Sequence, residues 1–313
     1  MFKNLIVYRI GPTWQPQLET VVEQLAKAEF AECSATQEKS MGWVPPRGDA
    51  HGPFVEAIGG QWVLKLMIET KAVPSSVINR KVKDKVAEIE QATGRKPGKK
   101  ETKELKEEAK QSLLPMAFSR QGSVGVWIDP AARLLLVDAS SQGKADDVVT
   151  ALIEQIEGLT LTLLQTQQSA GTAMSGWLVS QEAPAGFSID RECELKATDD
   201  SKAAVRYSKH ALDIDEVRAH IEAGKVPTKL AMTWQDRVSF LLTDNLQIKK
   251  VTFLEGVYDG AGGNKEDGFD ADVAIATGEL VQLLPELVEA LGGEVEPVSY
   301  THLTLPTTTL CRS

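Results

Sequence analysis

Alternating apolar and polar positions predict short strands and helices in irregular succession. Strand patterns occur at residues 2–10, 62–68, 124–129 and 134–138. Helical spacing of apolar residues occurs at residues 18–30 and 145–156. Residues 42–60 are rich in Gly and Pro and are expected to form a loop. Mixed elements in this order are typical of an α+β fold.

The last third of the chain predicts a β-meander and a closing helix. Apolar runs at residues 229–234, 238–243 and 248–254 follow one another so closely that they are expected to pair as antiparallel neighbours. The sheet is therefore at least partly antiparallel. A helix is expected over residues 270–291, where leucines recur at helical spacing before a Gly-Gly pair.

A polar segment in the first half predicts a helical hairpin. Residues 76–111 are rich in Lys and Glu and have few apolar positions, and the turn signals at 93–98 divide them in two. Between Arg80 and Lys110 there are 11 basic and 7 acidic residues. A solvated face and a phosphate-contacting face are both compatible with this excess of positive charge.

These patterns divide the chain into five parts. We expect an N-terminal α+β part at residues 1–75, the basic helical hairpin at 76–112 and a second α+β part at 113–165. A C-terminal α+β part with the meander follows at 166–294. Residues 295–313 are rich in Thr and lack periodicity, so they are expected to be a disordered or foreign tail.

Composition indicates an intracellular globular protein. Of the 313 residues, 42% are hydrophobic and 25% are charged. The sequence has neither an apolar stretch of about 18 residues nor an N-terminal secretory signal, so no membrane partner is expected. Cys33, Cys193 and Cys311 are far apart and odd in number, which favours reduced thiols over disulfides or a thiolate metal site.

Charge is unevenly distributed along the chain. The formal net charge is −10, yet residues 1–130 contain 19 basic and 16 acidic residues, whereas the rest contains 15 and 28. Screening over about 8–10 Å makes a polyanion respond to nearby charges rather than to the total. The acidic total therefore does not exclude a nucleic-acid partner.

Familiar catalytic motifs are absent from the sequence. It contains no phosphate-binding G-x-x-x-x-G-K-[ST] loop, no G-x-G-x-x-G after a strand and no G-x-S-x-G nucleophile elbow. Its four histidines lack metal-ligand spacing. We therefore expect no enzyme activity, no catalytic residue, no metal site and no cofactor.

Two groups of charged residues leave alternatives open. Carboxylates that could hold a nuclease metal ion gather near the last helix, although a solvated loop with an acidic first helical turn is favoured: Asp259, Glu266, Asp267, Asp270 and Asp272. In and beside the meander, four cations could reach phosphates along apolar stems or guard a sheet edge: Lys229, Arg237, Lys249 and Lys250.

Several blocks in order along the chain carry a resemblance to a known family. The blocks are Met1–Leu5 with Val7–Arg9, Met41–Pro46, Leu113–Pro115 with Ala117–Arg120, Trp127–Asp129, Ile221–Lys225 with Thr228–Ala231, and Phe269–Asp272 leading to Thr277–Leu280. Through them the chain resembles the recombination-associated protein RdgC family of bacteria. The blocks extend from residue 1 to about 294, and Met116 stands where a relative can carry a basic residue.

The resemblance implies a DNA-binding protein without sequence preference. It implies an α+β, horseshoe-like chain that pairs head-to-head and tail-to-tail into a two-fold ring with a positively charged hole. Duplex DNA would pass through the hole, with single-stranded DNA left open as a further ligand. Such a protein would reside in the cytoplasm at the nucleoid and would compete with RecA, restraining recombination by occupying DNA.

Ten residues are predicted to contact DNA. Phe118 and Arg120 fall in a block near the family's ring surface, and Lys209 and His210 fall in a segment that resembles one facing the hole. The complete predicted set is Arg9, Phe118, Arg120, Arg206, Lys209, His210, Lys225, Lys229, Lys249 and Lys250. The competing interpretations are a metal-dependent nuclease and a protein-interaction scaffold whose basic hairpin binds an acidic partner.

Overall fold

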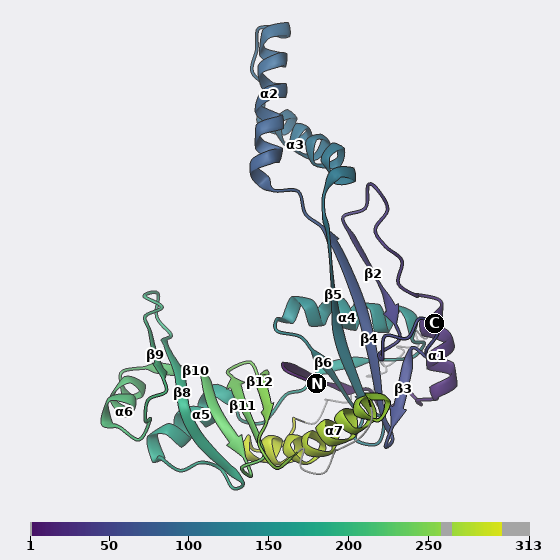
Figure 1. Ribbon diagram of the computed structural model, residues 1–313. Helices are drawn as coiled ribbons and strands as arrows, with labels where there is room; N and C mark the ends of the chain where they lie inside the picture. The colour runs from purple at the N-terminus through teal and green to yellow at the C-terminus, as the bar shows by residue number, and fades with distance from the viewer. Residues whose placement is uncertain (1, 258–264, 296–313) are drawn as a thin grey trace, which may run out of the picture.

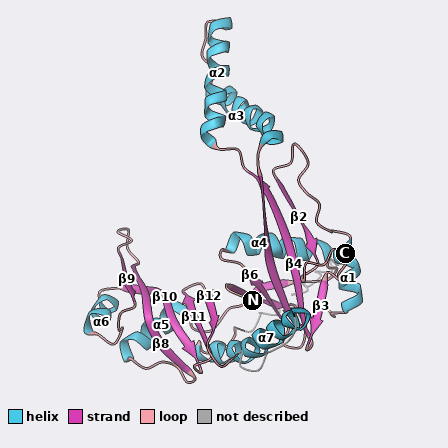
Figure 2. Cartoon of the chain, viewed as in Figure 1, coloured by secondary structure: helices cyan, strands magenta, loops and turns pink. Residues whose placement is uncertain are grey.

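The computed structural model describes residues 2–257 and 265–295 (Figure 1). Helices and strands alternate along the chain, as Figure 2 shows. The helices are α1 (Leu18–Ala26), α2 (Ser75–Thr93), α3 (Lys99–Leu113), α4 (Gln142–Gln155), α5 (Ala170–Ser180), α6 (Asp215–Glu222) and α7 (Lys265–Ala290). The strands are β1 (Leu5–Ile10), β2 (Lys39–Val44), β3 (Val55–Ile58), β4 (Gln61–Lys71), β5 (Ser119–Asp129), β6 (Leu134–Asp138), β7 (Leu161–Leu163), β8 (Phe187–Ala197), β9 (Ala204–Ser208), β10 (Lys225–Trp234), β11 (Val238–Thr243) and β12 (Ile248–Phe253).

The described strands form one 12-stranded sheet. Its order is β2-β4-β5-β6-β1-β12-β11-β10-β8-β9, with β3 paired to β4 and β7 paired to β1. Every pairing between these strands is antiparallel. The predicted α+β class and the β10–β11–β12 meander are therefore confirmed.

The sheet has two halves that meet at β1 and β12. The registered pair at this junction is Leu5 with Ile248, and the N–H of Val251 also donates to the carbonyl of Lys3 at 3.0 Å. Figure 1 shows the two halves as arms of an open arc, with α7 passing beneath both. The helical hairpin stands beyond the far ends of β4 and β5.

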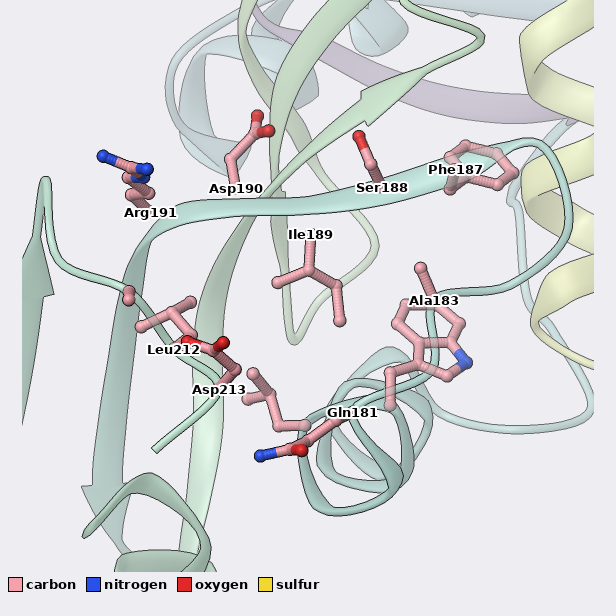
Figure 3. A pocket seen from close by; sticks show the side chains of 12 residues that line it. Gln181, Ala183, Phe187, Ser188, Ile189, Asp190, Arg191, Leu212 and Asp213 are labelled. Carbon is pink, nitrogen blue, oxygen red and sulfur yellow. The ribbon is translucent and has the colours of Figure 1, made fainter. Parts of the chain in front are cut away.

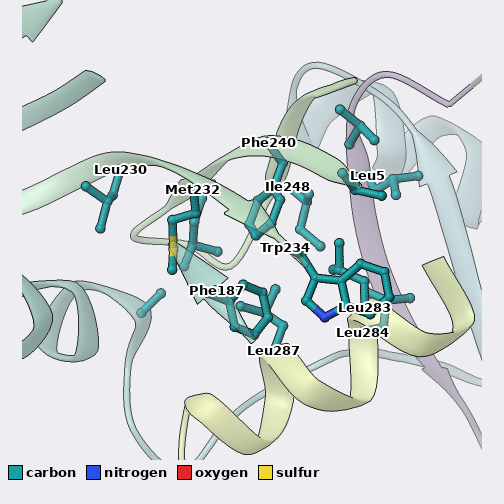
Figure 4. Close-up of a cluster of buried hydrophobic side chains, with 14 of the residues drawn as sticks. Leu5, Phe187, Leu230, Met232, Trp234, Phe240, Ile248, Leu283, Leu284 and Leu287 are labelled. Atoms are coloured by element: carbon teal, nitrogen blue, oxygen red, sulfur yellow. The ribbon is translucent and has the colours of Figure 1, made fainter. Parts of the chain in front are cut away.

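Two hydrophobic clusters cover opposite faces of the sheet. One packs α1 and α4 against the half that contains β1 to β6. The other packs α5 and α7 against the half that contains β8 to β12, and it continues across the junction to Phe2 and Trp127. Figure 4 shows Trp234 against Leu283 and Leu284 of α7. Each buried leucine contributes about 1.5–3 kcal/mol, so α7 holds the two halves together.

The helical hairpin is confirmed as α2 and α3. Helix α2 ends at Gly94, whose φ of 71° is the left-handed conformation that glycine adopts readily, and its N–H donates to the carbonyl of Glu90 at 2.9 Å. The ammonium of Lys110 lies 2.6 Å from Glu38 and ties the hairpin to the body of the chain. Within α2 and α3, burial is confined to Val82 and Ala109.

The predicted loop at residues 42–60 is wrong in two places, because β2 and β3 occupy part of it. Gly42 belongs to β2, where a Cβ would lie only 2.3 Å from the Cα of Phe30. The segment before β2 runs beside it and accepts a hydrogen bond at Ala28 from the N–H of Trp43 at 2.9 Å. This glycine therefore permits close backbone approach rather than a turn.

Other differences concern elements without a clear periodicity. Strand β5 begins at Ser119, earlier than the pattern at 124–129 predicts, because its exposed first residues extend the ladder with β4. The pattern also fails to predict α5, β8 and β9. The predicted parts at 1–75 and 113–165 contribute to the same half of the sheet and share the cluster around α1 and α4. Residues 296–313 of the predicted tail lie outside the described residues.

The helices of the described ranges are not membrane-spanning candidates. None of them combines the length and the apolar character that crossing a bilayer requires.

Candidate nucleic-acid interface

Three charged residues lie side by side across neighbouring strands at one end of the sheet. Lys229 on β10 is in register with Glu194 on β8, and Glu194 is in register with Arg206 on β9. The flanking Cys193 and Leu195 are fully buried in the cluster that contains α5 and α7. Because successive strand residues alternate between faces, Glu194 and its two neighbours lie on the face opposite those helices.

Glu194 is the centre of this row and is only 3% exposed. Its carboxylate accepts hydrogen bonds from Lys229 Nζ at 3.2 Å, from Arg206 Nε at 3.1 Å and from Thr228 Oγ1 at 3.0 Å. Lys196 Nζ lies 3.1 Å away. The Arg206 guanidinium, helped by Lys196 and Lys229, holds the pKa of Glu194 far below its usual range despite burial. The carboxylate is therefore charged and surrounded by three cations.

Two consecutive lysines on β12 point toward the same region. Successive strand residues normally face opposite sides, but Lys250 has a φ of 52° and the register between β11 and β12 shifts beside it. Lys250 Nζ lies 2.8 Å from Glu192, and Lys249 Nζ donates to the carbonyl of Ser140 at 3.1 Å. The irregularity therefore brings both lysines to one surface.

These side chains line a cleft of about 360 Å³, here named the cationic cleft. Its charged lining consists of Arg206, Lys229, Lys249, Lys250, Glu192 and Glu194. Asn4 and Ser140, from the other half of the sheet, complete the wall, so the cleft lies where the two halves join. Four cations against two carboxylates give it a positive balance that suits phosphate.

The structure brings four of the ten predicted DNA-contacting residues into the cationic cleft. They are Arg206, Lys229, Lys249 and Lys250. Three others lie on or near β9 and β10 outside its lining. Lys225 Nζ is 3.2 Å from His220 Nδ1, Lys209 follows β9 with a φ of 55°, and His210 Nδ1 is 2.8 Å from the carbonyl of Ala211.

The remaining three predicted residues lie in the other half of the sheet. Arg9 on β1 donates from Nε to Glu294 at 2.8 Å, so its guanidinium is engaged within the chain. Phe118 and Arg120 lie at the base of the hairpin, where the Phe118 ring is 95% exposed. Arg120 forms no ion pair with any described residue.

The hairpin has both paired and unpaired cations. Lys85 pairs with Glu108 at 3.3 Å and Arg95 with Glu101 at 3.0 Å. Within the described ranges, the cations of the hairpin without an ion pair are Arg80, Lys81, Lys83, Lys99, Lys100, Lys103 and Lys106. This surface therefore has positive charge available for a polyanion, separate from the cationic cleft.

The carboxylates weighed as a nuclease site do not gather around a described cavity. Asp270 forms an ion pair with Arg47, which also lies 2.9 Å from Glu56. Asp259 and the side chains of Glu266 and Asp267 lie outside what the structure describes. Across the part of the chain that is described, no group of three or more His, Cys, Asp or Glu side chains is arranged to hold a metal ion.

Sequence reasoning missed the central carboxylate of the site. Glu192, Glu194 and Lys196 alternate with the buried Cys193 and Leu195 on β8. This alternation is the pattern of a half-buried strand and could have identified β8 and its charged face. The position of Glu194 between two cations could not have been found, since register with β9 and β10 is not visible in the pattern.

A second cavity lies elsewhere and has a different character. It has a volume of about 470 Å³ and is lined by residues of α5, β8 and the segment before α6, as Figure 3 shows. Its lining mixes apolar groups, such as Ile189 and Leu212, with Asp190, Arg191 and Asp213. It includes none of the ten predicted residues, and we assign it no part in DNA binding.

Known proteins resemble this chain over nearly its whole length. A family model described as "Putative exonuclease, RdgC" matches residues 1–294. A protein of Dechloromonas aromatica (strain RCB) named "Recombination-associated protein RdgC" is 45% identical over 300 residues, which cover 94% of this chain and 98% of the relative. Proteins of the same name from Janthinobacterium sp. (strain Marseille) and Bordetella pertussis (strain Tohama I) are 46% and 43% identical over 298 and 296 residues, covering 94% of this chain and 99% and 98% of the relatives.

Proposed function

The chain belongs to the RdgC family of recombination-associated proteins, as its sequence blocks indicated, and from this premise we propose that it binds duplex DNA without sequence preference. The observation that supports this most directly is the cationic cleft, where Arg206, Lys229, Lys249 and Lys250 meet on the side of the sheet opposite α5 and α7. Contacts from such cations to backbone phosphates position a protein on DNA but do not read its bases.

The proposed assembly is a homodimer that closes into a ring around the duplex. Two copies of the arc would double every cation that faces the enclosed space, so a modest cluster in each chain becomes a belt of charge. The hairpin bases, with the exposed Phe118, are the surfaces we assign to one of the two contacts between copies. The acidic remainder of the surface would limit adhesion of DNA elsewhere.

The proposed role is to restrain RecA-dependent recombination by occupying DNA at the nucleoid. Occupancy requires neither a nucleotide nor a metal ion, so we propose that the protein is not an enzyme. The engagement of Asp270 by Arg47 supports this over a metal-dependent nuclease. Incubating DNA with the protein and Mg²⁺ or Mn²⁺ tests the alternative, because strand cleavage would contradict a purely binding role.

A salt titration on random duplexes tests DNA binding. Each phosphate neutralised by a cation contributes about −0.9 to the slope of log K against log salt, so several contacts give a steep slope that is the same for unrelated sequences. Sequence-dependent slopes, or no binding in dilute buffer, would contradict the proposal. The scaffold alternative predicts the latter result.

Two further experiments address the ring and RecA. After loading in dilute buffer, a ring should stay on nicked circular DNA at high salt and should slide off a linear duplex of the same length. Equal loss from both would contradict encirclement.

Strand exchange by RecA should fall as the protein covers the DNA, and inhibition that requires ATP hydrolysis by this chain would contradict the occupancy mechanism.

A further inference from the structure

Glu194 presents an electrostatic contradiction within the cationic cleft. A carboxylate repels phosphate, so the simplest expectation is that this residue weakens DNA binding. Yet Glu194 is 3% exposed, and its carboxylate accepts hydrogen bonds from Arg206, Lys229 and Thr228. The charge that DNA would meet directly is therefore that of the cations around it.

The cations around Glu194 keep donors free for a ligand. The side chain of Arg206 remains 67% exposed, that of Lys196 48% and that of Lys229 35%, although all three contact Glu194. A guanidinium has five N–H donors and an ammonium has three, and the bonds to one carboxylate use only part of them. The three heads are thus fixed in position and still open to solvent.

The magnitudes of two opposing effects decide the role of Glu194. Immobilising a long side chain on binding weakens affinity by about two- to tenfold, and Glu194 fixes three of them before DNA arrives. One additional negative charge about 8 Å from a phosphate weakens affinity by about two- to thirtyfold, depending on whether the effective dielectric is that of water or that of a protein surface. Preorganisation of three side chains therefore outweighs the repulsion from one buried carboxylate.

We propose that Glu194 is a positioning residue for phosphate binding, which holds Arg206, Lys229 and Lys196 in the arrangement that receives the DNA backbone. The inference rests on the proposed DNA-binding function and deepens it. It makes an unusual prediction, since removing a negative charge from a DNA-binding surface should weaken binding to DNA.

Glu192 provides a matched control in the same cleft. It is also a carboxylate on β8, but its side chain is 38% exposed and it pairs with one cation, Lys250, at 2.8 Å. Replacing Glu192 with Gln frees Lys250 from its ion pair and removes one negative charge, as Glu194→Gln does. Glu192→Gln is therefore expected to raise affinity about twofold, whereas Glu194→Gln is expected to lower it about tenfold.

The experiment measures the affinity of full-length variants for a random-sequence duplex at several salt concentrations. Glu194→Asp keeps the charge on a shorter side chain and should recover part of the affinity that Glu194→Gln loses. A loss caused only by unfolding would appear in a melting curve. Equal gains in Glu192→Gln and Glu194→Gln would overturn the inference while leaving DNA binding intact.

A second variant covers the case in which Glu194→Gln does not fold. Thr228 Oγ1 donates to the Glu194 carboxylate at 3.0 Å, so Thr228→Val loosens that group without changing any charge. We expect a two- to threefold loss of affinity, and no loss would contradict the positioning role. Failure of the wild-type chain to bind any duplex would instead reject the proposed function itself.

Discussion

The ammonium of Lys229 lies 3.2 Å from both carboxylate oxygens of Glu194, its cross-strand neighbour. Lysine is at the surface and glutamate is beneath it, so the pair connects the interior of the sheet to the cationic cleft. A buried carboxylate without a partner is costly, and here the compensating charges are the ones available to a ligand. Stability and the proposed DNA binding therefore depend on the same contacts.

Glu194→Gln should destabilise the chain by about 2 kcal/mol at neutral pH. The substitution leaves Arg206, Lys196 and Lys229 close together without their shared carboxylate, and a hydrogen bond to a charged group typically contributes about 1.5–3 kcal/mol. Denaturant unfolding of the wild type and the variant at pH 7 measures the difference. A change below about 0.5 kcal/mol would mean that the buried carboxylate contributes little to folding.

The difference between the two chains should shrink in acid. The folded-state pKa of Glu194 lies below its unfolded value, so its contribution is complete above the unfolded pKa and is lost as pH falls through the folded one. The window begins near pH 4, the usual range of a glutamate. Denaturant unfolding from pH 7 to pH 3 checks this, and a constant difference across that range would contradict it.

Single alanine substitutions in the cationic cleft should flatten the salt dependence of DNA binding. Lys229→Ala, Lys249→Ala or Arg206→Ala each removes one potential phosphate contact, so the slope of log K against log salt should change by about 0.9 for each true contact. Lys39→Ala is the control, because Lys39 lies on β2 at the opposite end of the sheet order and pairs with Asp147 at 2.7 Å. Unchanged slopes for all three cleft variants would remove the cleft from the DNA path.

Periodicity predicted the elements whose apolar residues face a core. The leucines of α7 and the runs of β10 to β12 were visible because burial imposes a period of 3.6 or 2. Strand β2 was missed because its Gly42 serves a close backbone approach, which in sequence has the same appearance as a turn. The beginning of β5 was missed because it is exposed on both faces and gives no alternation.

The site was predictable only as a set of cations. Lys229, Lys249 and Lys250 were identified because positive charge within apolar strands is conspicuous. Their convergence on one cleft depends on the irregular Lys250 backbone and on the register of β8 with β10, neither of which has a sequence signal. The pairing of Arg206 with Glu194 follows from the register of β9 with β8.

Phe118→Ser should leave the stability of a single chain almost unchanged. Its ring is 95% exposed and buries nothing, so the expected effect on unfolding is within about 0.5 kcal/mol. An exposed aromatic at the hairpin base is instead suited to contact with a second copy. Sedimentation should show weaker self-association of the variant, and a strong drop in melting temperature with unchanged association would contradict this assignment.

Cys193 should be inert to thiol reagents in the native protein. Burial raises its pKa to about 12, and the neighbouring Glu194 carboxylate adds to this, so the reactive thiolate is almost absent at pH 8. Alkylation followed by peptide mass spectrometry should label Cys193 only after unfolding. Rapid labelling in native buffer would show that the sheet opens locally near β8.

Replacing the helical hairpin with a short turn should leave the body of the chain folded. Lys71 at the end of β4 is in register with Ser119 at the start of β5, so a two-residue Asn-Gly turn after a few retained residues can close the β4–β5 ladder. The hairpin buries little against the body, and Lys110 with Glu38 is an exposed pair of small value. The shortened chain should therefore keep a cooperative unfolding transition.

DNA binding by the shortened chain should become less salt-dependent, because the unpaired lysines of α2 and α3 are gone, and the same titration on random duplexes measures this. Retention of the wild-type slope would show that those lysines face only solvent.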